Sequence, residues 1–125
     1  MAERYKLGQT LINKLNPEAS EKLSSGLSGI CPDMEKYIIE FAYGDILQRP
    51  DLDIQTRELI TIGILTAMGN SERQLKNHIE GALNLGCPPK KIVEVILQTV
   101  LYAGFPAAMN GMALVNEIFK VRNIS

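Results

Sequence analysis

Three helical patterns decide the fold of this chain, and they read RELITIGILTAMGN (residues 57–70), SERQLKNHIEGALNLG (71–86) and PPKKIVEVILQTVLYAGFPAAMNG (88–111). In each pattern apolar residues recur at intervals of three and four, which is the spacing of one face of an α-helix. Short breaks separate the patterns. No stretch of the chain alternates apolar and polar residues with the period of a strand. The sequence therefore predicts an all-α fold of about seven helices.

The length and charge of the chain exclude several classes of protein. A chain of 125 residues suits one domain, which can bury a core without metal or disulfide support. The formal net charge is −1 and the basic residues are scattered, which argues against nucleic acid or an anionic membrane as the main partner. The longest mostly apolar run, 59–68, is far shorter than the roughly 20 residues of a membrane span. The N-terminus also lacks the apolar core of a signal peptide, so we expect a cytoplasmic protein.

The cysteines do not predict a metal site. Cys31 and Cys87 are far apart in sequence and form no C-x-x-C or other metal-type spacing. His78 is the one histidine of the chain. Two cysteines and one histidine are too few soft ligands for a structural zinc site, so we expect no metal.

The first third of the chain predicts two helices. Residues 3–15 have apolar side chains at helical spacing, and Asn16 followed by Pro17 ends this helix. Asn16 can also cap the second helix, with Pro17 at its first position. The segment SSGLSG (24–29) is rich in helix breakers, so it predicts a short second helix followed by a mobile loop.

The domain prediction follows from this division. We expect a single domain over residues 1–125, with an N-terminal helical extension over 1–31 and a core over 32–125. The extension would act as a lid or as a dimer-side element, or it would merely cover core surface. Pro32 opens a third helix, which we expect to end before Arg49 because the next residue is a proline.

The ends of the central helices are marked by capping signals. Asp53 or Thr56 would cap the fourth helix, whose near-continuous apolar run predicts burial on most sides. Ser71 and Gln74 have the spacing of a capping box, which would start the fifth helix. Gly86 is placed to end that helix in the left-handed conformation.

The last two main helices begin at prolines. The sixth helix starts after Cys87, and its buried face is predicted to consist of Ile92, Val93, Ile96, Leu97 and Val100. The turn 104–106 then leads into the last helix. Small residues in that helix permit close approach of another backbone.

His78 projects from the apolar side of the fifth helix, three residues after Leu75 and four before Ala82. One interpretation is a neutral core residue hydrogen-bonded to a carbonyl or a side chain. The other is a general acid or base that is tuned by burial and a nearby carboxylate. Helical spacing does not choose between them.

Glu58 is the candidate partner of His78. It lies in the first turn of the fourth helix and its helical position faces inward. It either complements the helix dipole or orients His78 and holds a proton of its own. Arg57 and Arg49 could clamp a carboxylate substrate, although surface placement is the usual fate of arginine. We favour Glu58 over either arginine.

Three further residues have both a functional and a packing interpretation. Cys87 stands at a helix start, where the helix dipole can lower a thiol pKa, but a small apolar residue at a loop–helix junction is commoner. Tyr102 and Asn110 flank the YAGFP turn and could donate hydrogen bonds into a pocket. For either one alone, ordinary packing is the commoner outcome.

Longer segments of the chain resemble a known family. They read FAYGDILQRPDLDIQTRELITIGILTAMGN, LKNHIEGALNLG, KKIVEVILQ and LYAGFPAAMNGM. The most specific pieces are the RPDLD–TRE spacing, H-x-x-GAL-x-x-G and YAGFPAAMN. From about Tyr37 to Phe119 the sequence resembles the carboxymuconolactone decarboxylase family. The resemblance implies an all-helical fold shared with the alkylhydroperoxidase D superfamily, assembled as a ring-like homo-oligomer, commonly a hexamer.

The resemblance also distinguishes two branches of that superfamily. The peroxidase branch uses a C-x-x-C-x-x-x-H motif, with a glutamate on the preceding helix. Counting back from His78, the two thiol positions hold Ser71 and Gln74. The dithiol mechanism therefore does not carry over, whereas His78 and Glu58 do.

The resemblance implies decarboxylation of 4-carboxymuconolactone to the enol-lactone of 3-oxoadipate, a reaction of aromatic-acid catabolism. No cofactor is needed, because the ring double bond can delocalise the electrons onto the lactone carbonyl. The implied catalytic residues are His78, as proton donor or carbonyl partner, and Glu58, which orients it. The implied substrate-binding residues are Arg57, Tyr102, Phe105 and Asn110.

Two alternatives from other classes remain. One is a peroxide- or disulfide-handling protein that uses Cys87 and Cys31. The other is a non-catalytic oligomeric binding module. Self-association is expected on a second ground, because the fourth and last helices are apolar around more of their circumference than a small monomer can cover.

Overall fold

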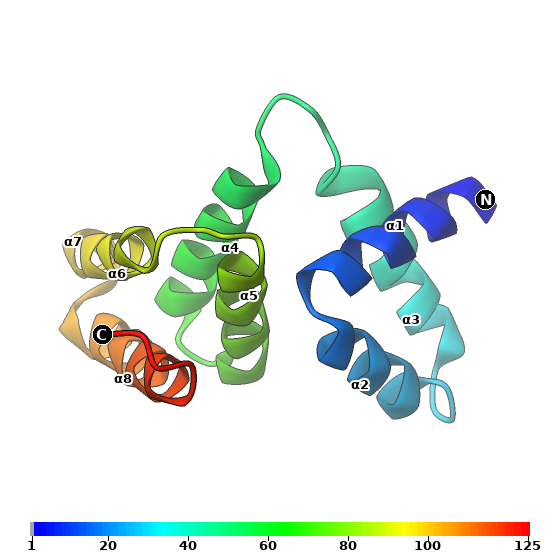
Figure 1. Ribbon diagram of the computed structural model, residues 1–125. Helices are drawn as coiled ribbons and strands as arrows, with labels where there is room; N and C mark the ends of the chain where they lie inside the picture. Colours follow the sequence, from blue (N-terminus) through cyan, green and yellow to red (C-terminus); the bar gives the residue numbers. More distant parts are fainter. Residues whose placement is uncertain (1) are drawn as a thin grey trace. The chain divides into compact units, whose positions relative to one another are not determined.

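The structure is a computed structural model that describes residues 2–125 (Figure 1). Within this range the chain is mostly helical and has no strand, which confirms the predicted all-α fold. It divides into two compact units, one that ends at Ile54 and one over Gln55–Ser125. The elements are α1 (Ala2–Leu15), α2 (Pro17–Leu27), α3 (Pro32–Tyr37), η1 (Ile38–Ile46), α4 (Ile54–Met68), α5 (Glu72–Asn84), α6 (Pro89–Gln98), α7 (Val100–Ala103) and α8 (Phe105–Val121).

Within the first unit, α2 begins as its capping signals predict. The side chain of Asn16 accepts a hydrogen bond from the backbone N–H of Ala19 at 3.1 Å, and Pro17 opens α2. The predicted break over residues 24–29 starts too early, because α2 continues through Leu27. A few poor helix formers cost little when the rest of a helix is packed against a neighbour.

The third helix widens into a π-helix, which the sequence did not predict. Over η1 the hydrogen bonds span five residues, as from the N–H of Leu47 to the carbonyl of Ala42 at 2.9 Å. The helical segment ends before Arg49 and Pro50, as expected. Such turns are rare and tolerated only where tertiary packing supports them.

Close contact between α1 and η1 supplies that packing. A Cβ at Gly8 would overlap the carbonyl of Ile39, and one at Gly44 would lie 2.5 Å from the carbonyl oxygen of Arg4. The guanidinium of Arg4 also donates to both carboxylate oxygens of Asp45, at 3.0 and 2.7 Å. The two glycines therefore let the backbones meet, and an ion pair fixes their register.

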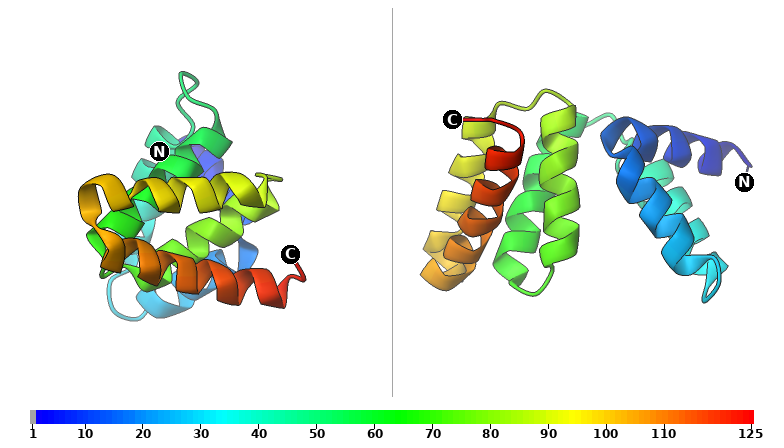
Figure 2. Two further views of the ribbon diagram at one scale, coloured as in Figure 1. Left: turned by 90° about the vertical axis from the view of Figure 1, so that its left-hand side faces the viewer. Right: turned by 60° about the horizontal axis from the view of Figure 1, so that its bottom comes forward.

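The second unit is a helical bundle with one apolar core. Figure 2 shows α8 running alongside α6, with α4 and α5 beside them, and α8 contacts both α5 and α6. Its fully buried side chains include Ile62, Ile79, Ile92 and Ile96. This core holds α4 and α5, the two helices of the candidate site.

The end of α5 and the start of α8 show which turn residues predicted a helix boundary correctly. Gly86 adopts φ 85° after α5, and Gly104 adopts φ 92° before α8, so both glycines take the left-handed region that favours them. The predicted capping box starts α5 at the right residue, but its side-chain hydrogen bond was wrong. Ser71 precedes α5, but its hydroxyl does not cap the helix and instead lies 3.5 Å from the Asn70 side chain.

Two burial predictions were also wrong for the single chain. The fourth helix was expected to be buried on most sides, yet Ile60, Ile64 and Met68 are 45, 55 and 59% exposed. Leu97, predicted for the buried face of α6, is 52% exposed. In both cases helical spacing identified apolar residues without showing whether this chain covers them.

The division into units bears on the domain prediction. Residues 32–46 belong to the first compact unit, together with the helices of the predicted extension. A single domain with an extension over 1–31 and a core over 32–125 stays a prediction. In the part of the chain that the structure describes, no helix is long and apolar enough to span a membrane.

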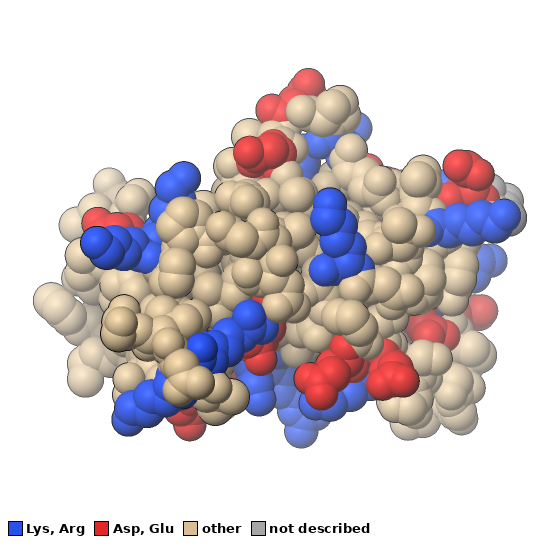
Figure 3. All heavy atoms as spheres, in the orientation of Figure 1, with Lys and Arg blue, Asp and Glu red and all other residues tan. Residues whose placement is uncertain are grey.

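The charged side chains are mixed in sign. On the face shown in Figure 3, acidic and basic groups are interspersed and separated by uncharged surface. This distribution agrees with the formal net charge of −1. It gives no broad field of one sign on that face.

Candidate active site

His78 and Glu58 form a hydrogen-bonded pair between two helices of the second unit. The Nδ1 atom of His78 on α5 lies 2.8 Å from Oε2 of Glu58 on α4. The Glu58 side chain is 0% exposed and the His78 side chain is 18% exposed. The pair therefore has one fully enclosed member and one member that reaches the surface.

The apolar pattern of the two helices positions this pair. Ile62 follows Glu58 by four residues and Ala82 follows His78 by four, and both Ile62 and Ala82 are 0% exposed. Residues four apart lie on the same helical face, so burial of Ile62 turns Glu58 inward. The core thus fixes the direction of both side chains.

The pairing defines what each ring nitrogen of His78 can do. Because Nδ1 faces a carboxylate, it carries the proton of the bond and Glu58 accepts it. The other nitrogen, Nε2, is left to exchange a proton with a bound molecule. An imidazolium would be stabilised by the Glu58 carboxylate. This is the arrangement of a general acid with an orienting partner.

The second carboxylate oxygen of Glu58 is buried without a protein donor. Among residues 2–125, Oε1 receives no hydrogen bond. A buried charged acceptor without a partner is costly, commonly about 1–3 kcal/mol or more. A water molecule or a polar group of a bound molecule would satisfy it.

Arg57 precedes Glu58 on α4 and is half-buried. Its carbonyl accepts a hydrogen bond from the Thr61 hydroxyl at 2.9 Å, within the helix. Its position next to the pair keeps it as a candidate anchor for a carboxylate.

The residues of the YAGFP turn lie on the surface of the chain. Tyr102 is 98% exposed and Phe105 is 68% exposed. Within one chain neither side chain is enclosed, so their substrate-binding roles stay predictions. Any such role requires another surface to cover them.

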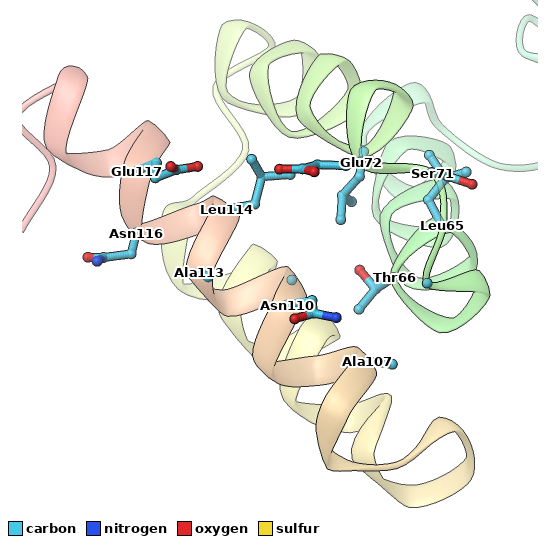
Figure 4. A pocket seen from close by; sticks show the side chains of 13 residues that line it. Leu65, Thr66, Ser71, Glu72, Ala107, Asn110, Ala113, Leu114, Asn116 and Glu117 are labelled. Atoms are coloured by element: carbon cyan, nitrogen blue, oxygen red, sulfur yellow. The ribbon is translucent and has the colours of Figure 1, made fainter.

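Asn110 lies in a cavity of about 580 Å³ between α4, α5 and α8, shown in Figure 4. Neither His78 nor Glu58 lines this cavity. Its lining includes Thr66, Glu72 and Glu117, which were not singled out from the sequence. A threonine inside an apolar helix was the available signal, but its spacing resembles that of a core position.

Burial disfavours the reactive interpretation of Cys87. This side chain is 2% exposed, and burial raises the pKa of its thiol while the charge of Lys91 opposes the shift. A raised pKa leaves less of the reactive thiolate at neutral pH. Cys31 is exposed and belongs to the first unit, and both cysteines are free.

The described residues form no metal site of the usual kind. Within residues 2–125, no group of three or more His, Cys, Asp or Glu side chains is arranged to hold a metal ion.

The comparison with known families covers the region that contains the pair. The model of the carboxymuconolactone decarboxylase family matches residues 32–117, which is more than half of the chain. The chain belongs to the carboxymuconolactone decarboxylase family. The matched region includes His78, Glu58 and all the predicted substrate-binding residues.

Two of the relatives carry decarboxylase names. The 4-carboxymuconolactone decarboxylase of Acinetobacter baylyi is 34% identical over 119 residues, which cover 94% of this chain and 88% of the relative. The nitrosuccinic acid decarboxylase of Metarhizium robertsii is 31% identical over 83 residues, 66% of this chain and 57% of the relative. An uncharacterised 15.0 kDa protein of Paracoccus denitrificans is 27% identical over 113 residues, 90% of this chain and 84% of the relative.

Proposed function

We propose that this protein decarboxylates a carboxylated lactone without a cofactor, with 4-carboxymuconolactone as substrate and the enol-lactone of 3-oxoadipate as product. The observation that carries the proposal is the 2.8 Å contact between His78 and the buried Glu58. The 34% identity with a relative named for this reaction supports the choice of substrate.

The proposed reaction needs no external electron acceptor. The bond between the ring carbon and its carboxylate breaks, and carbon dioxide leaves without the bonding electrons. Those electrons move through the ring double bond toward the lactone carbonyl, and a proton then adds to the ring carbon beside that carbonyl. The enzyme must stabilise the charge on the carbonyl oxygen and supply the proton.

His78 and Glu58 can meet both needs in this proposal. The imidazolium of His78 donates from Nε2, first as a hydrogen bond to the developing charge and then as a proton to carbon. Glu58 holds the ring through Nδ1 and stabilises its charged form. Glu58 is thus a positioning residue and His78 is the catalytic one.

The carboxylate that remains on the substrate requires a cationic or hydrogen-bonding anchor. We assign this role to Arg57 or Tyr102, with Phe105 as an apolar wall. Asn110 is left out of this site, because its cavity also carries the carboxylates of Glu72 and Glu117. Two like charges would repel a substrate with two carboxylates.

We also propose that the protein works as a homo-oligomer, a ring-like hexamer in the cytoplasm. Exposed apolar side chains of the second unit support self-association, since monomers rarely leave many large apolar groups uncovered. They are Ile60, Ile64, Met68, Leu97, Leu101, Tyr102, Phe105 and Met109. A neighbouring copy would then cover Tyr102 and Phe105.

The test is turnover of the purified lactone, followed by carbon dioxide release, in the unmodified protein and in His78→Asn. Asparagine retains a donor near the position of Nδ1 but cannot deliver the proton. We expect the rate to fall by about 10²–10⁴-fold, the usual loss when a general acid is removed. Glu58→Gln should lower the rate about 10- to 150-fold, the equivalent of a hydrogen bond to a charged group.

The matched control is Asn77→Ala, which changes the exposed neighbour of His78 on α5. Its rate should equal that of the unmodified protein. An unchanged rate in His78→Asn would remove the catalytic role of His78. If the unmodified protein does not turn over the lactone, the substrate assignment is wrong and the binding-module alternative gains support.

A further inference from the structure

A side-chain hydrogen bond joins the start of α4 to the end of α5. The Nε2 atom of Gln55, in the first turn of α4, donates to the backbone carbonyl of Leu85 at 3.1 Å, and this bond is partly buried. Leu85 is the C-terminal cap residue of α5. The last carbonyls of a helix have no donor within the helix. The amide of Gln55 therefore satisfies a backbone group that α5 cannot satisfy itself.

This bond connects the same two helices as the His78–Glu58 contact. Gln55 precedes Glu58 by three residues, so the two side chains lie on one face of α4. Leu85 follows His78 by about two helical turns. The bond from Gln55 to Leu85 and the contact of His78 with Glu58 thus join α4 to α5 at successive turns.

The start of α4 is the place where such a bond matters. The first compact unit ends at Ile54 and the second begins at Gln55, so the chain enters α4 in the turn that precedes Glu58. The first N–H groups of a helix have no acceptor within the helix, and helix ends fray. Fraying of this turn would change the direction of the Glu58 side chain. A bond that holds the turn against α5 prevents that change.

We propose that Gln55 is a positioning residue for His78. Its bond to Leu85 holds the first turn of α4 against the end of α5, and this keeps the Glu58 carboxylate on Nδ1 of His78. The neutral ring is thereby held in the tautomer that carries its proton on Nδ1, with Nε2 left for a bound molecule. The catalytic part of this inference rests on the proposed decarboxylation, whereas the tautomer is a property of the protein alone.

The test is nuclear magnetic resonance of the full chain labelled with ¹⁵N-histidine, which gives the signals of one ring because His78 is the one histidine of the chain. The nitrogen shifts of the neutral ring, at the alkaline end of a titration, give the ratio of the two tautomers. We expect the Nδ1–H form to dominate in the unmodified protein. In Gln55→Met, which keeps the length of the side chain but removes the donor, this ratio should fall about three- to tenfold, the equivalent of one neutral hydrogen bond.

The matched control is Gln48→Met. Gln48 also donates to a backbone carbonyl, that of Tyr43 at 3.2 Å, but it belongs to the first unit, which contains neither His78 nor Glu58. This variant should keep the tautomer ratio of the unmodified protein.

Two further variants separate the donor from the rest of the side chain. Gln55→Asn has an amide that is one methylene shorter, so it should act as Gln55→Met does, and either variant suffices for the test. Gln55→Lys supplies an ammonium donor at the end of α5, where a cation is favoured, so it should restore the ratio. Circular dichroism checks that each variant is folded.

Turnover of the lactone is the second measurement. In Gln55→Met we expect kcat to fall about three- to tenfold with KM unchanged, because the residues that contact the substrate remain. If the unmodified protein does not turn over the lactone, the proposed function fails, and the tautomer ratio alone decides the role of Gln55. An unchanged ratio in the folded Gln55 variants overturns the proposal, as does an equal change in Gln48→Met. Failure of Gln55→Lys to restore the ratio also contradicts it.

Discussion

At the scale of single residues, Glu58 is enclosed with one protein hydrogen bond. Its Oε2 atom is bound by His78, while Oε1 has no donor among the described residues. The inward position of Glu58 could be predicted from helical spacing, and its pairing with His78 from the family resemblance. The lack of a donor for Oε1 could not be predicted, because it depends on how neighbouring side chains fill the space around this oxygen.

The burial of Glu58 predicts an asymmetric effect of substitutions on stability. His78→Leu should lower the free energy of unfolding by about 3–5 kcal/mol, because it leaves a buried carboxylate without its partner. Adding Glu58→Leu to that variant should recover part of the loss, since the uncompensated charge is then gone. Urea unfolding followed by circular dichroism measures both. Additive losses in the double variant would show that the two residues do not interact.

Cys87 shows how burial can override a helix-start position. The sequence places this thiol near the positive end of α6, but the structure encloses it and burial raises its pKa. In Cys31→Ser protein, alkylation by iodoacetamide should therefore be slow at neutral pH. The rate should keep rising with pH above the ordinary thiol range, because the raised pKa delays formation of the thiolate.

Unfolding provides the control for that measurement. In guanidinium chloride Cys87 is exposed, so its alkylation at neutral pH should become fast. Rapid alkylation of the folded Cys31→Ser variant at neutral pH would show that the Cys87 thiol is accessible. That result would support the alternative of a peroxide- or disulfide-handling protein. Cys87→Ser should not alter lactone turnover.

At the scale of elements, the sequence predicts helices well where one residue decides the end. Asn16 caps α2, and Gly86 and Gly104 take the left-handed region at two turns. The sequence does not predict the type of helix where several weak conformational preferences compete. The π-helical turns of η1 pack against α1, and the nine apolar-rich residues of this segment do not distinguish a π-helix from an α-helix.

The contact of α1 with η1 predicts a sharp difference between two glycines. Gly8→Ala should destabilise the protein by at least about 1–3 kcal/mol, because the new methyl group overlaps the carbonyl of Ile39. Gly26→Ala is the matched control in α2, where a Cβ would meet nothing within 4 Å. It should stabilise the protein by about 0.5–1 kcal/mol. Thermal unfolding compares them, and equal effects would contradict the tight contact.

The ion pair between α1 and η1 predicts a dependence on pH. The hydrogen bond from Arg4 holds the pKa of the Asp45 carboxyl below its usual range. Because this pKa is lowered, the Arg4–Asp45 pair contributes its full stabilisation at pH values above the ordinary carboxyl pKa of about 4. It is lost as pH falls through the lowered pKa. Asp45→Asn should therefore lose less stability on acidification than the unmodified protein.

The control for this prediction is Asp51→Asn, which changes an exposed aspartate that the structure shows in no ion pair. Its unfolding temperature should follow pH as the unmodified protein does. The effect of Asp45→Asn should also shrink in high salt, because exposed charges are screened. An identical acid response in both variants would contradict the role of the Arg4–Asp45 pair.

At the scale of the whole molecule, the exposed apolar stripe of α4 is the feature that one chain leaves incomplete. Ile60, Ile64 and Met68 recur every four residues, and all three are more than 40% exposed. The sequence predicted that this helix would be covered, and the single chain does not cover it. The proposed oligomer would explain both the predicted burial and the observed exposure, because a neighbouring copy can bury a stripe that the single chain leaves exposed.

The exposed stripe of α4 predicts the effect of one charge on assembly. Ile64→Glu should shift the protein from a hexamer toward smaller species, since burying an unpaired carboxylate in an apolar interface costs several kcal/mol. Light scattering coupled to size exclusion measures the mass. Ile30→Glu is the control, because Ile30 is 85% exposed but belongs to the first unit, which does not contain the α4 stripe. A monomeric unmodified protein would contradict the assembly itself. An Ile64→Glu variant that stays fully assembled would instead show that the interface uses another surface, of which the residues around Tyr102 and Phe105 are the next candidate.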